Sequence, residues 1–145
     1  MIFRDMIYFK KMCLKRRYKN MIKTIATEKA PAAVGPYSQG KIVGNILYCA
    51  GQGGIDPAVG KIVDGGVQAE AEQACKNVGA LLEEAGTNFD NVVEVTCFLA
   101  DMGDFGAFNE IYAKYFTSKP ARTCVAAKDL PLGMLCEIKV IAAVE

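Results

Sequence analysis

The chain of 145 residues contains no histidine. Histidine is the usual general base of enzymes, the base of catalytic triads and the commonest metal ligand. Its absence excludes a histidine general base, a histidine-based triad and a metal site with histidine ligands. The six cysteines include no Cys-x-x-Cys pair, and without histidine to complete a ligand set the sequence predicts no zinc or other metal site. Chemistry in this protein must therefore rest on arginine, carboxylates, thiols or backbone groups.

Long apolar runs and nucleotide-binding motifs are also lacking. No apolar run approaches the roughly 18 residues that a membrane helix needs. The glycine-rich stretch 50–54 is not followed by Gly-Lys-Ser/Thr, and no G-x-G-x-x-G pattern occurs, so neither common phosphate-binding loop is predicted. These glycines favour a wide turn instead.

Charge is unevenly distributed along what the length predicts to be a single domain. Residues 1–20 hold seven basic residues and one acidic residue, a net charge of 7 − 1 = +6. The remainder holds 10 basic and 15 acidic residues, a net charge of −5. An acidic body argues against general binding to nucleic acid. Most of its cysteines lie in apolar contexts, which favours reduced, buried thiols in a cytoplasmic protein.

The first 20 residues differ from the rest, because they are basic and hydrophobic and contain no Gly, Pro or Ser. A targeting peptide is one interpretation, although the apolar stretch 6–9 is short for a signal sequence and serine is missing. A basic amphipathic helix that touches membranes or RNA is a second. We favour an extension outside the fold, since Met21 restarts an ordinary N-terminus. The domain is then residues 21–145.

Periodicity predicts the elements of this domain. Gly44 and Asn45 indicate a hairpin turn, and Gly86 indicates the end of a helix. The expected strands are 21–26, 41–43, 46–50, 91–100, 123–127 and 134–144; the expected helices are 68–85 and 104–116, the second capped by Asp104; the segment 51–66 is expected to be loop. This order predicts an α+β two-layer sandwich, with a mixed sheet and two helices on one face.

The other face of the sheet is half apolar. In the last strand it carries Leu135, Glu137, Lys139, Ile141 and Ala143. A monomer would expose this face to water, whereas a second sheet would cover it. We therefore expect a homo-oligomer with clefts between its subunits.

Arg122 is the leading candidate for chemistry, since its guanidinium is always charged and binds carboxylates in bidentate fashion. Cys124 shares a strand face with Arg122, and Glu137 could join them if the two strands lie close together. Glu137 could instead be a solvated or ion-paired strand charge. Cys124 could be a small packing residue, because no histidine activates it. Tyr37 presents a phenol from a loop that two prolines restrict.

Together these segments resemble the RidA (YjgF) family of small enamine and imine deaminases, from Met21 to the C-terminus. The resemblance is carried by the runs Gly35-Pro36-Tyr37-Ser38-Gln39-Gly40, Gly51-Gln52, Asp104-Phe105 through Asn109, Pro120-Ala121-Arg122-Thr123-Cys124-Val125 and Cys136-Glu137-Ile138. It implies a chorismate-mutase-like fold and a homotrimer with three clefts between subunits. It also implies that no cofactor is needed.

The activity implied by the resemblance is hydrolysis of 2-iminobutanoate and 2-iminopropanoate to 2-oxo acids and ammonia. Such imines are released by pyridoxal-phosphate enzymes, for example threonine dehydratase. By the same resemblance Arg122 binds the substrate carboxylate, Glu137 positions the attacking water, and Tyr37, Asn109 and Cys124 line the cleft. A protonated imine is already electrophilic, so positioning and a weak base suffice for its hydrolysis.

Two other functions stay open. The same arginine could serve a non-catalytic module that binds small 2-oxo or 2-amino acids, since a fold does not fix a function. RNA binding or cleavage is the other, against which the acidic body and the missing histidine argue. The chain departs from the family pattern at Ala50, where members often carry a small hydroxyl residue; this leaves the substrate preference open.

Overall fold

A computed structural model describes residues 21–145. The predicted extension 1–20 lies outside the described residues. The strands are β1 (Ile22–Ile25), β2 (Gly40–Val43), β3 (Ile46–Cys49), β4 (Gln52–Gly53), β5 (Ile55–Asp56), β6 (Lys61–Ile62), β7 (Val92–Leu99), β8 (Ala121–Ala126) and β9 (Cys136–Ala143). The two long helices are α2 (Gly66–Glu84) and α3 (Phe105–Tyr115).

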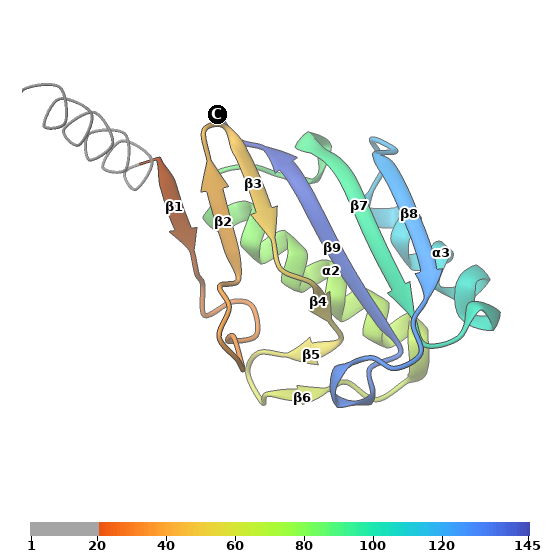
Figure 1. The fold of residues 1–145 in the computed structure, drawn as a ribbon. Coiled ribbons are helices and arrows are strands. Elements are labelled where there is room, and N and C mark those ends of the chain that lie inside the picture. Colours follow the sequence, from red (N-terminus) through yellow and green to blue (C-terminus); the bar gives the residue numbers. More distant parts are fainter. Residues whose placement is uncertain (1–20) are drawn as a thin grey trace, which may run out of the picture.

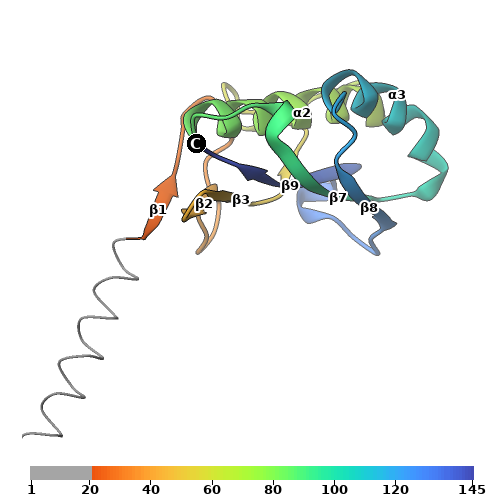
Figure 2. The same cartoon turned by 90° about the horizontal axis from the view of Figure 1, so that it is seen from above.

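The main sheet runs in the order β1-β2-β3-β9-β7-β8, with β4 also paired to β9 (Figure 1). The pair β7–β8 is parallel and the other pairs of this sheet are antiparallel. Both helices lie on one face of the sheet, and neither α2 nor α3 covers the opposite face of residues 21–145 (Figure 2). The predicted α+β sandwich, with its mixed sheet and its two helices on one face, is confirmed.

The core lies between the helices and the inner face of the sheet. Strand β9 alternates as expected: Cys136, Ile138, Val140 and Ala142 are fully buried between its outward residues. Inner residues of α2 and α3 pack against them; examples are Ala74, Val78, Leu81 and Phe108. Of the cysteines described, Cys49, Cys75, Cys97 and Cys136 are buried and Cys124 is half-buried, all five as free thiols. This agrees with the sequence-based expectation of buried, reduced cysteines.

The prediction that residues 51–66 form a loop is wrong in part. This segment contains the three short strands β4, β5 and β6, which hydrogen bonding forms despite six glycines. Helix α2 also begins earlier than expected, because Gly65 and Gly66 adopt positive φ angles that glycine tolerates.

A register irregularity between Val92 and Glu94 in β7 buries Val92 and leaves Val93 exposed, so strict alternation along this strand is interrupted there. The predicted cap of the second helix also needs correction. Asp104 makes no side-chain capping bond. Asp101 does so instead, by accepting from the backbone N–H of Gly103 at 2.7 Å in the short turn before α3.

Within residues 21–145, no helix has the length and apolar character that crossing a membrane would require.

Candidate active site

Arg122 lies on the edge strand β8 and faces the helix layer. In the parallel register Arg122 pairs with Val95 and Cys124 with Cys97. Val95 and Cys97 are fully buried beneath the helices, and paired residues of neighbouring strands share a face. The prediction that Arg122 and Cys124 lie on one strand face is therefore confirmed by the register.

Helix α3 holds the Arg122 side chain in place. Its Nη1 donates a hydrogen bond to Oδ1 of Asn109 at 2.7 Å. The guanidinium carbon lies 4.6 Å from the ring centroid of Tyr112 and 5.6 Å from that of Phe105, close enough for cation–π attraction. A fixed guanidinium loses less entropy when it binds an anion. Asn109 and the aromatic rings thus preorganise Arg122.

A hollow of about 380 Å³ opens beside this arginine, and we call it the arginine groove. Its lining is mostly apolar or aromatic apart from the arginine, its asparagine partner, a threonine and a lysine. The lining residues are Asn109, Tyr112, Ala113, Phe116, Thr117, Lys119, Pro120 and Arg122. This composition suits a small anion with a short apolar side chain.

Cys124 is half-buried next to this groove. Burial raises the pKa of its thiol, and the nearby charge of Arg122 offsets this only in part. A raised pKa keeps the sulfur protonated and therefore a poor nucleophile. The interpretation of Cys124 as a lining or packing residue, rather than as a nucleophile, is the one that this environment favours.

Glu137 lies in a second hollow, of about 270 Å³, which we call the glutamate groove. Tyr37, Gln52, Leu132 and Met134 are among its lining residues. The Glu137 side chain is half-buried, and this burial raises its pKa above the ordinary value of 4.5. A carboxylate with a raised pKa is a better proton acceptor than an exposed one.

The glycines of β4 make room for Glu137. A Cβ atom on Gly51 would lie 1.9 Å from Oε1 of Glu137, and one on Gly53 would lie 1.9 Å from Sδ of Met134. The prediction that these glycines form a wide turn is therefore wrong. They leave room for the side chains of Glu137 and Met134, and Gly51 and Gln52 line the glutamate groove.

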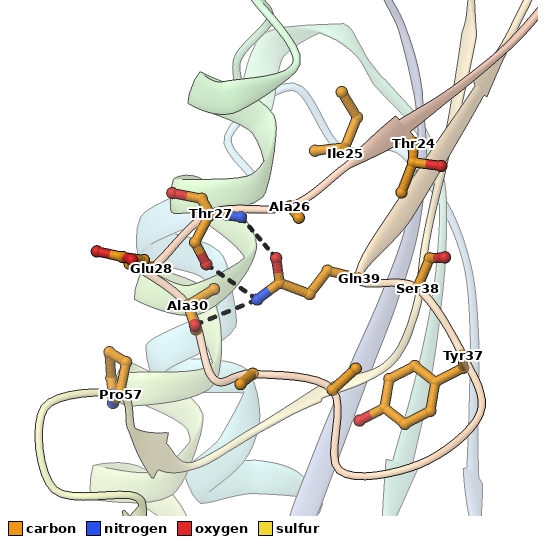
Figure 3. Close-up of a pocket in the computed structure, with 12 residues that line it drawn as sticks. Thr24, Ile25, Ala26, Thr27, Glu28, Ala30, Tyr37, Ser38, Gln39 and Pro57 are labelled. Carbon is orange, nitrogen blue, oxygen red and sulfur yellow. Dashed lines mark hydrogen bonds between the residues drawn. The ribbon is translucent and has the colours of Figure 1, made fainter.

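The Tyr37 loop is fastened by Gln39, a residue that sequence reasoning did not single out (Figure 3). Its buried amide accepts from the N–H of Thr27 at 2.7 Å and donates to the carbonyl oxygens of Thr27, Ala30 and Pro31. These bonds leave the Tyr37 ring half exposed at the end of a fixed loop. The position of Gln39 in the Gly35–Gly40 run was the available signal.

The loop also borders a third, open hollow of about 580 Å³, which runs along β1 and past Pro57 (Figure 3). Its walls are largely backbone and small side chains. Glu28 is its one charged lining residue, so it offers no cation for an anionic substrate. We therefore place the chemistry in the other two hollows.

The arginine groove and the glutamate groove lie on opposite faces of the sheet. Strand β7 separates β8 from β9, and Glu137 pairs with Phe98, one position along β7 from the fully buried Cys97. Neighbouring positions of a strand point to opposite faces. The structure thus brings Arg122 together with Asn109, and Glu137 together with Tyr37, but one chain does not join the two pairs.

No cluster of three or more Cys, Asp or Glu side chains that could hold a metal ion occurs in the described part of the chain.

Comparison with known proteins identifies the family. Residues 27–144 match the family described as Endoribonuclease L-PSP. The chain belongs to this family. The resemblance on which the sequence-based expectation rested is thereby confirmed.

Relatives within the L-PSP family carry different names. A Mus musculus protein named 2-iminobutanoate/2-iminopropanoate deaminase is 53% identical over 121 residues, which cover 83% of this chain and 90% of the relative. A Lactococcus lactis protein named "Putative regulator AldR" is 48% identical over 125 residues, covering 86% of this chain and 99% of the relative. The crystal structure of RidA from a Psychrobacter species superposes with a TM-score of 0.81 at 41% identity, covering 84% and 99%.

Proposed function

We propose that this L-PSP family member hydrolyses small 2-imino acids, such as 2-iminobutanoate and 2-iminopropanoate, to 2-oxo acids and ammonium. The observation that carries the proposal is the exposed guanidinium of Arg122, held by Asn109 in a chain without histidine. Close identity to a protein named for this activity supports it. These substrates carry a carboxylate, an electrophilic carbon and a short apolar side chain.

Arg122 binds the substrate carboxylate. One of its N–H groups is engaged by Asn109, and the remaining donors can form a bidentate pair with the anion. The apolar wall of the arginine groove receives the side chain of the imino acid. Anchoring at the carboxylate fixes the position of the adjacent iminium carbon, which lowers the entropic part of the barrier.

Glu137 positions and deprotonates the attacking water. The oxygen of water bonds to the iminium carbon, one of its protons passes to the carboxylate, and a tetrahedral amino alcohol forms. Glu137 then returns that proton to the nitrogen, and the carbon–nitrogen bond breaks with its electron pair going to nitrogen. The hydroxyl proton passes to the departing ammonia, so that ammonium and the neutral carbonyl of the 2-oxo acid leave. No metal or organic cofactor enters these steps, and the negative charge of Glu137 also stabilises the cationic imine.

The complete site forms between two subunits. The two grooves open on opposite faces of one chain, so the arginine groove of one subunit must meet the glutamate groove of another. The uncovered sheet face supports such an assembly, because the outward side chains of Tyr48 and Val43 are 44% and 39% exposed there. We propose a homotrimer, with Tyr37 and Cys124 lining each cleft and residues 21–145 forming the working domain.

Pyridoxal-phosphate enzymes that eliminate water from hydroxy amino acids would supply the substrate, threonine dehydratase among them. The decisive assay lets that enzyme generate 2-iminobutanoate while semicarbazide competes for it. Wild type should accelerate formation of 2-oxobutanoate. Arg122→Ala should lower this acceleration at least about 100-fold, and Arg122→Lys should recover little of it, because lysine lacks the planar fork.

Lys128→Ala is the matched control, since it removes an exposed cation beyond the end of β8 and should leave turnover unchanged. Turnover by Arg122→Ala at the wild-type rate would contradict the role given to the arginine. Absence of turnover in wild type would contradict the proposed activity as a whole.

A second candidate function is non-catalytic sensing of small 2-oxo or 2-amino acids, favoured by the identity to the AldR regulator. The same arginine groove would bind the ligand. Titration with 2-oxobutanoate beside the turnover assay separates the two functions. Binding that depends on Arg122 without any turnover would favour the sensor.

RNA cleavage is a third candidate, since the family's description names an endoribonuclease. The net charge of −5 on residues 21–145 and the missing histidine argue against it. Comparing RNA binding by the full chain and by a chain that starts at Met21 tests this. Equal, tight binding by both would overturn the charge argument.

A further inference from the structure

Helix α2 carries two polar side chains on its buried face. Glu70 is 4% exposed and Asn77 is fully buried, among apolar neighbours such as Ala74 and Val78. Residues seven positions apart lie on the same side of a helix, about two turns from each other. Burying a polar group costs free energy unless it is hydrogen-bonded, so we expect both side chains to have hydrogen-bond partners.

Asn77 holds the backbone of β4 and β5. Its Nδ2 donates to the carbonyl oxygens of Gly53 at 3.0 Å and of Ile55 at 2.9 Å. Its Oδ1 accepts from Nε2 of Gln73 at 2.9 Å, which fixes the orientation of the amide. The backbone from Gly53 to Ile55 is thus hydrogen-bonded to α2, on the helix-covered face of the sheet.

Glu70 holds the chain that leads into β9. Its Oε2 accepts from the backbone N–H of Leu135 at 2.7 Å, directly before Cys136, the first residue of β9. The same side chain lies against Gly54, where a Cβ atom would come within 2.6 Å of the Cα atom of Glu70. The preceding turn contains Leu132 at a φ of 60°, a conformation that a branched side chain rarely adopts without support.

The two segments held in this way are the two that frame Glu137. Gly53 is its register partner across the sheet, and Gly51 leaves the space that its carboxylate occupies. Leu135 and Cys136 directly precede it. The α2 side chains touch the backbone on the helix side, and the carboxylate of Glu137 projects from the opposite side.

We propose that Glu70 is a positioning residue for Glu137: it fixes the start of β9 while Asn77 fixes β4, and together they set the gap into which the Glu137 carboxylate projects. This inference rests on the proposed function, in which that carboxylate orients the attacking water. Misplacing a reacting group by about 1 Å can cost about 100-fold in rate. Glu70 is buried and does not line the glutamate groove, so it acts through the backbone alone.

The test compares three substitutions in the full chain by imine hydrolysis. Glu70→Met keeps the side-chain length but removes the acceptor, and it should lower kcat at least about tenfold while KM changes less than about threefold, because Arg122 is untouched. Glu70→Gln retains an oxygen acceptor for Leu135 and should rescue most of kcat. Val78→Ala destabilises the same buried face without removing a polar group, and it should leave kcat of the folded protein near wild type.

Backbone hydrogen exchange supplies a readout that does not depend on turnover. The amides of Leu135 and Cys136 should exchange faster in Glu70→Met than in wild type and Glu70→Gln, whereas Val78→Ala should not single out this segment. If Glu70→Met fails to fold, Glu70→Asp withdraws the acceptor by one methylene and should show the same pattern more weakly.

The proposal is overturned if Glu70→Met keeps kcat within about twofold of wild type, or if Val78→Ala at an equal loss of thermal stability lowers kcat as much. Unchanged exchange at Leu135 and Cys136 would also overturn it. If Leu135 and Cys136 exchange faster in Glu70→Met but wild type itself does not hydrolyse imines, the positioning role stands and the proposed function fails.

Discussion

Arg122 is exposed, yet it is not a loose surface charge. Its contacts with Asn109 and Tyr112 come from α3, an element that precedes it in sequence and packs over the end of β8. The sequence pointed to this arginine because its guanidinium binds carboxylates in bidentate fashion and because the run Pro120–Val125 resembles a family motif. The identity of its partners depends on how α3 packs against β8, which no local pattern encodes.

Gly51 offers a direct test of how Glu137 is placed. A methyl group at this position would overlap Oε1, Cδ and Cγ of Glu137, at 1.9, 2.5 and 2.8 Å. Because the obstacle is a side chain rather than backbone, the fold can survive while the carboxylate swings away. Gly51→Ala should therefore lower kcat/KM about as much as Glu137→Gln, with a circular dichroism spectrum like that of wild type. Full activity in Gly51→Ala would show that the carboxylate is not needed where the structure places it.

At Tyr112 the contribution of ring packing to stability can be measured separately from that of the hydroxyl group. Its hydroxyl is buried and has no hydrogen-bond partner among residues 21–145, while its ring stacks on Phe116 and lies beneath Arg122. Removing an unsatisfied buried hydroxyl relieves its desolvation cost, so Tyr112→Phe should be neutral or stabilising by up to about 1 kcal/mol in denaturant unfolding. Activity should persist because the ring remains. A clear loss of stability would reveal a partner for the hydroxyl.

At the scale of elements, regular periodicity predicted more than glycine-rich sequence did. The inner faces of α2 and β9 follow from alternation and helical spacing, and the Gly44-Asn45 hairpin follows from turn chemistry. Strands β4 to β6 were not predictable from their own residues: β4 pairs with the distant β9, β5 and β6 pair only with each other, and Asn77 of α2 bonds to the carbonyl oxygens of Gly53 and Ile55. The placement of Arg122 and Glu137 on opposite faces required the register across β7, which the sequence does not contain.

Glu70 of helix α2 should also make the stability of the folded protein depend on pH. Burial raises the pKa of Glu70 above 4.5, against the opposing effect of its backbone hydrogen bonds. A raised pKa means that the folded protein binds this proton more tightly than the unfolded chain does. The associated stability is fully present below the unfolded pKa and is lost as pH rises through the folded value.

The measurement is the melting temperature of wild type and Glu70→Gln from pH 4 to pH 7. Relative to the glutamine variant, wild type should lose stability as pH rises across this window, because glutamine does not titrate. Glu84→Gln, an exposed acid on the same helix, is the control and should follow wild type. Parallel curves for wild type and Glu70→Gln would contradict the raised pKa.

At the scale of the whole molecule, residues 21–145 present two grooves on opposite faces of the sheet and one sheet face that neither α2 nor α3 covers. Helices protect one face (Figure 2). The register of the strands places Tyr48, Ile141 and Phe98 on the other face, beside charged residues. The half-apolar pattern of β9 indicated this face before the structure did. Which surfaces meet is a property of the assembly, and for that reason the cleft could be proposed from sequence but not built from one chain.

The most direct test of the account mixes two inactive subunits. Arg122→Ala and Glu137→Gln chains with different affinity tags are co-expressed, and oligomers that carry both tags are purified and assayed for imine hydrolysis. If each site takes its arginine from one subunit and its glutamate from the next, every mixed trimer contains one working cleft, and activity should return to about a third of wild type. Mixed oligomers as inactive as either parent, beside active doubly tagged wild type, would contradict a site shared between subunits.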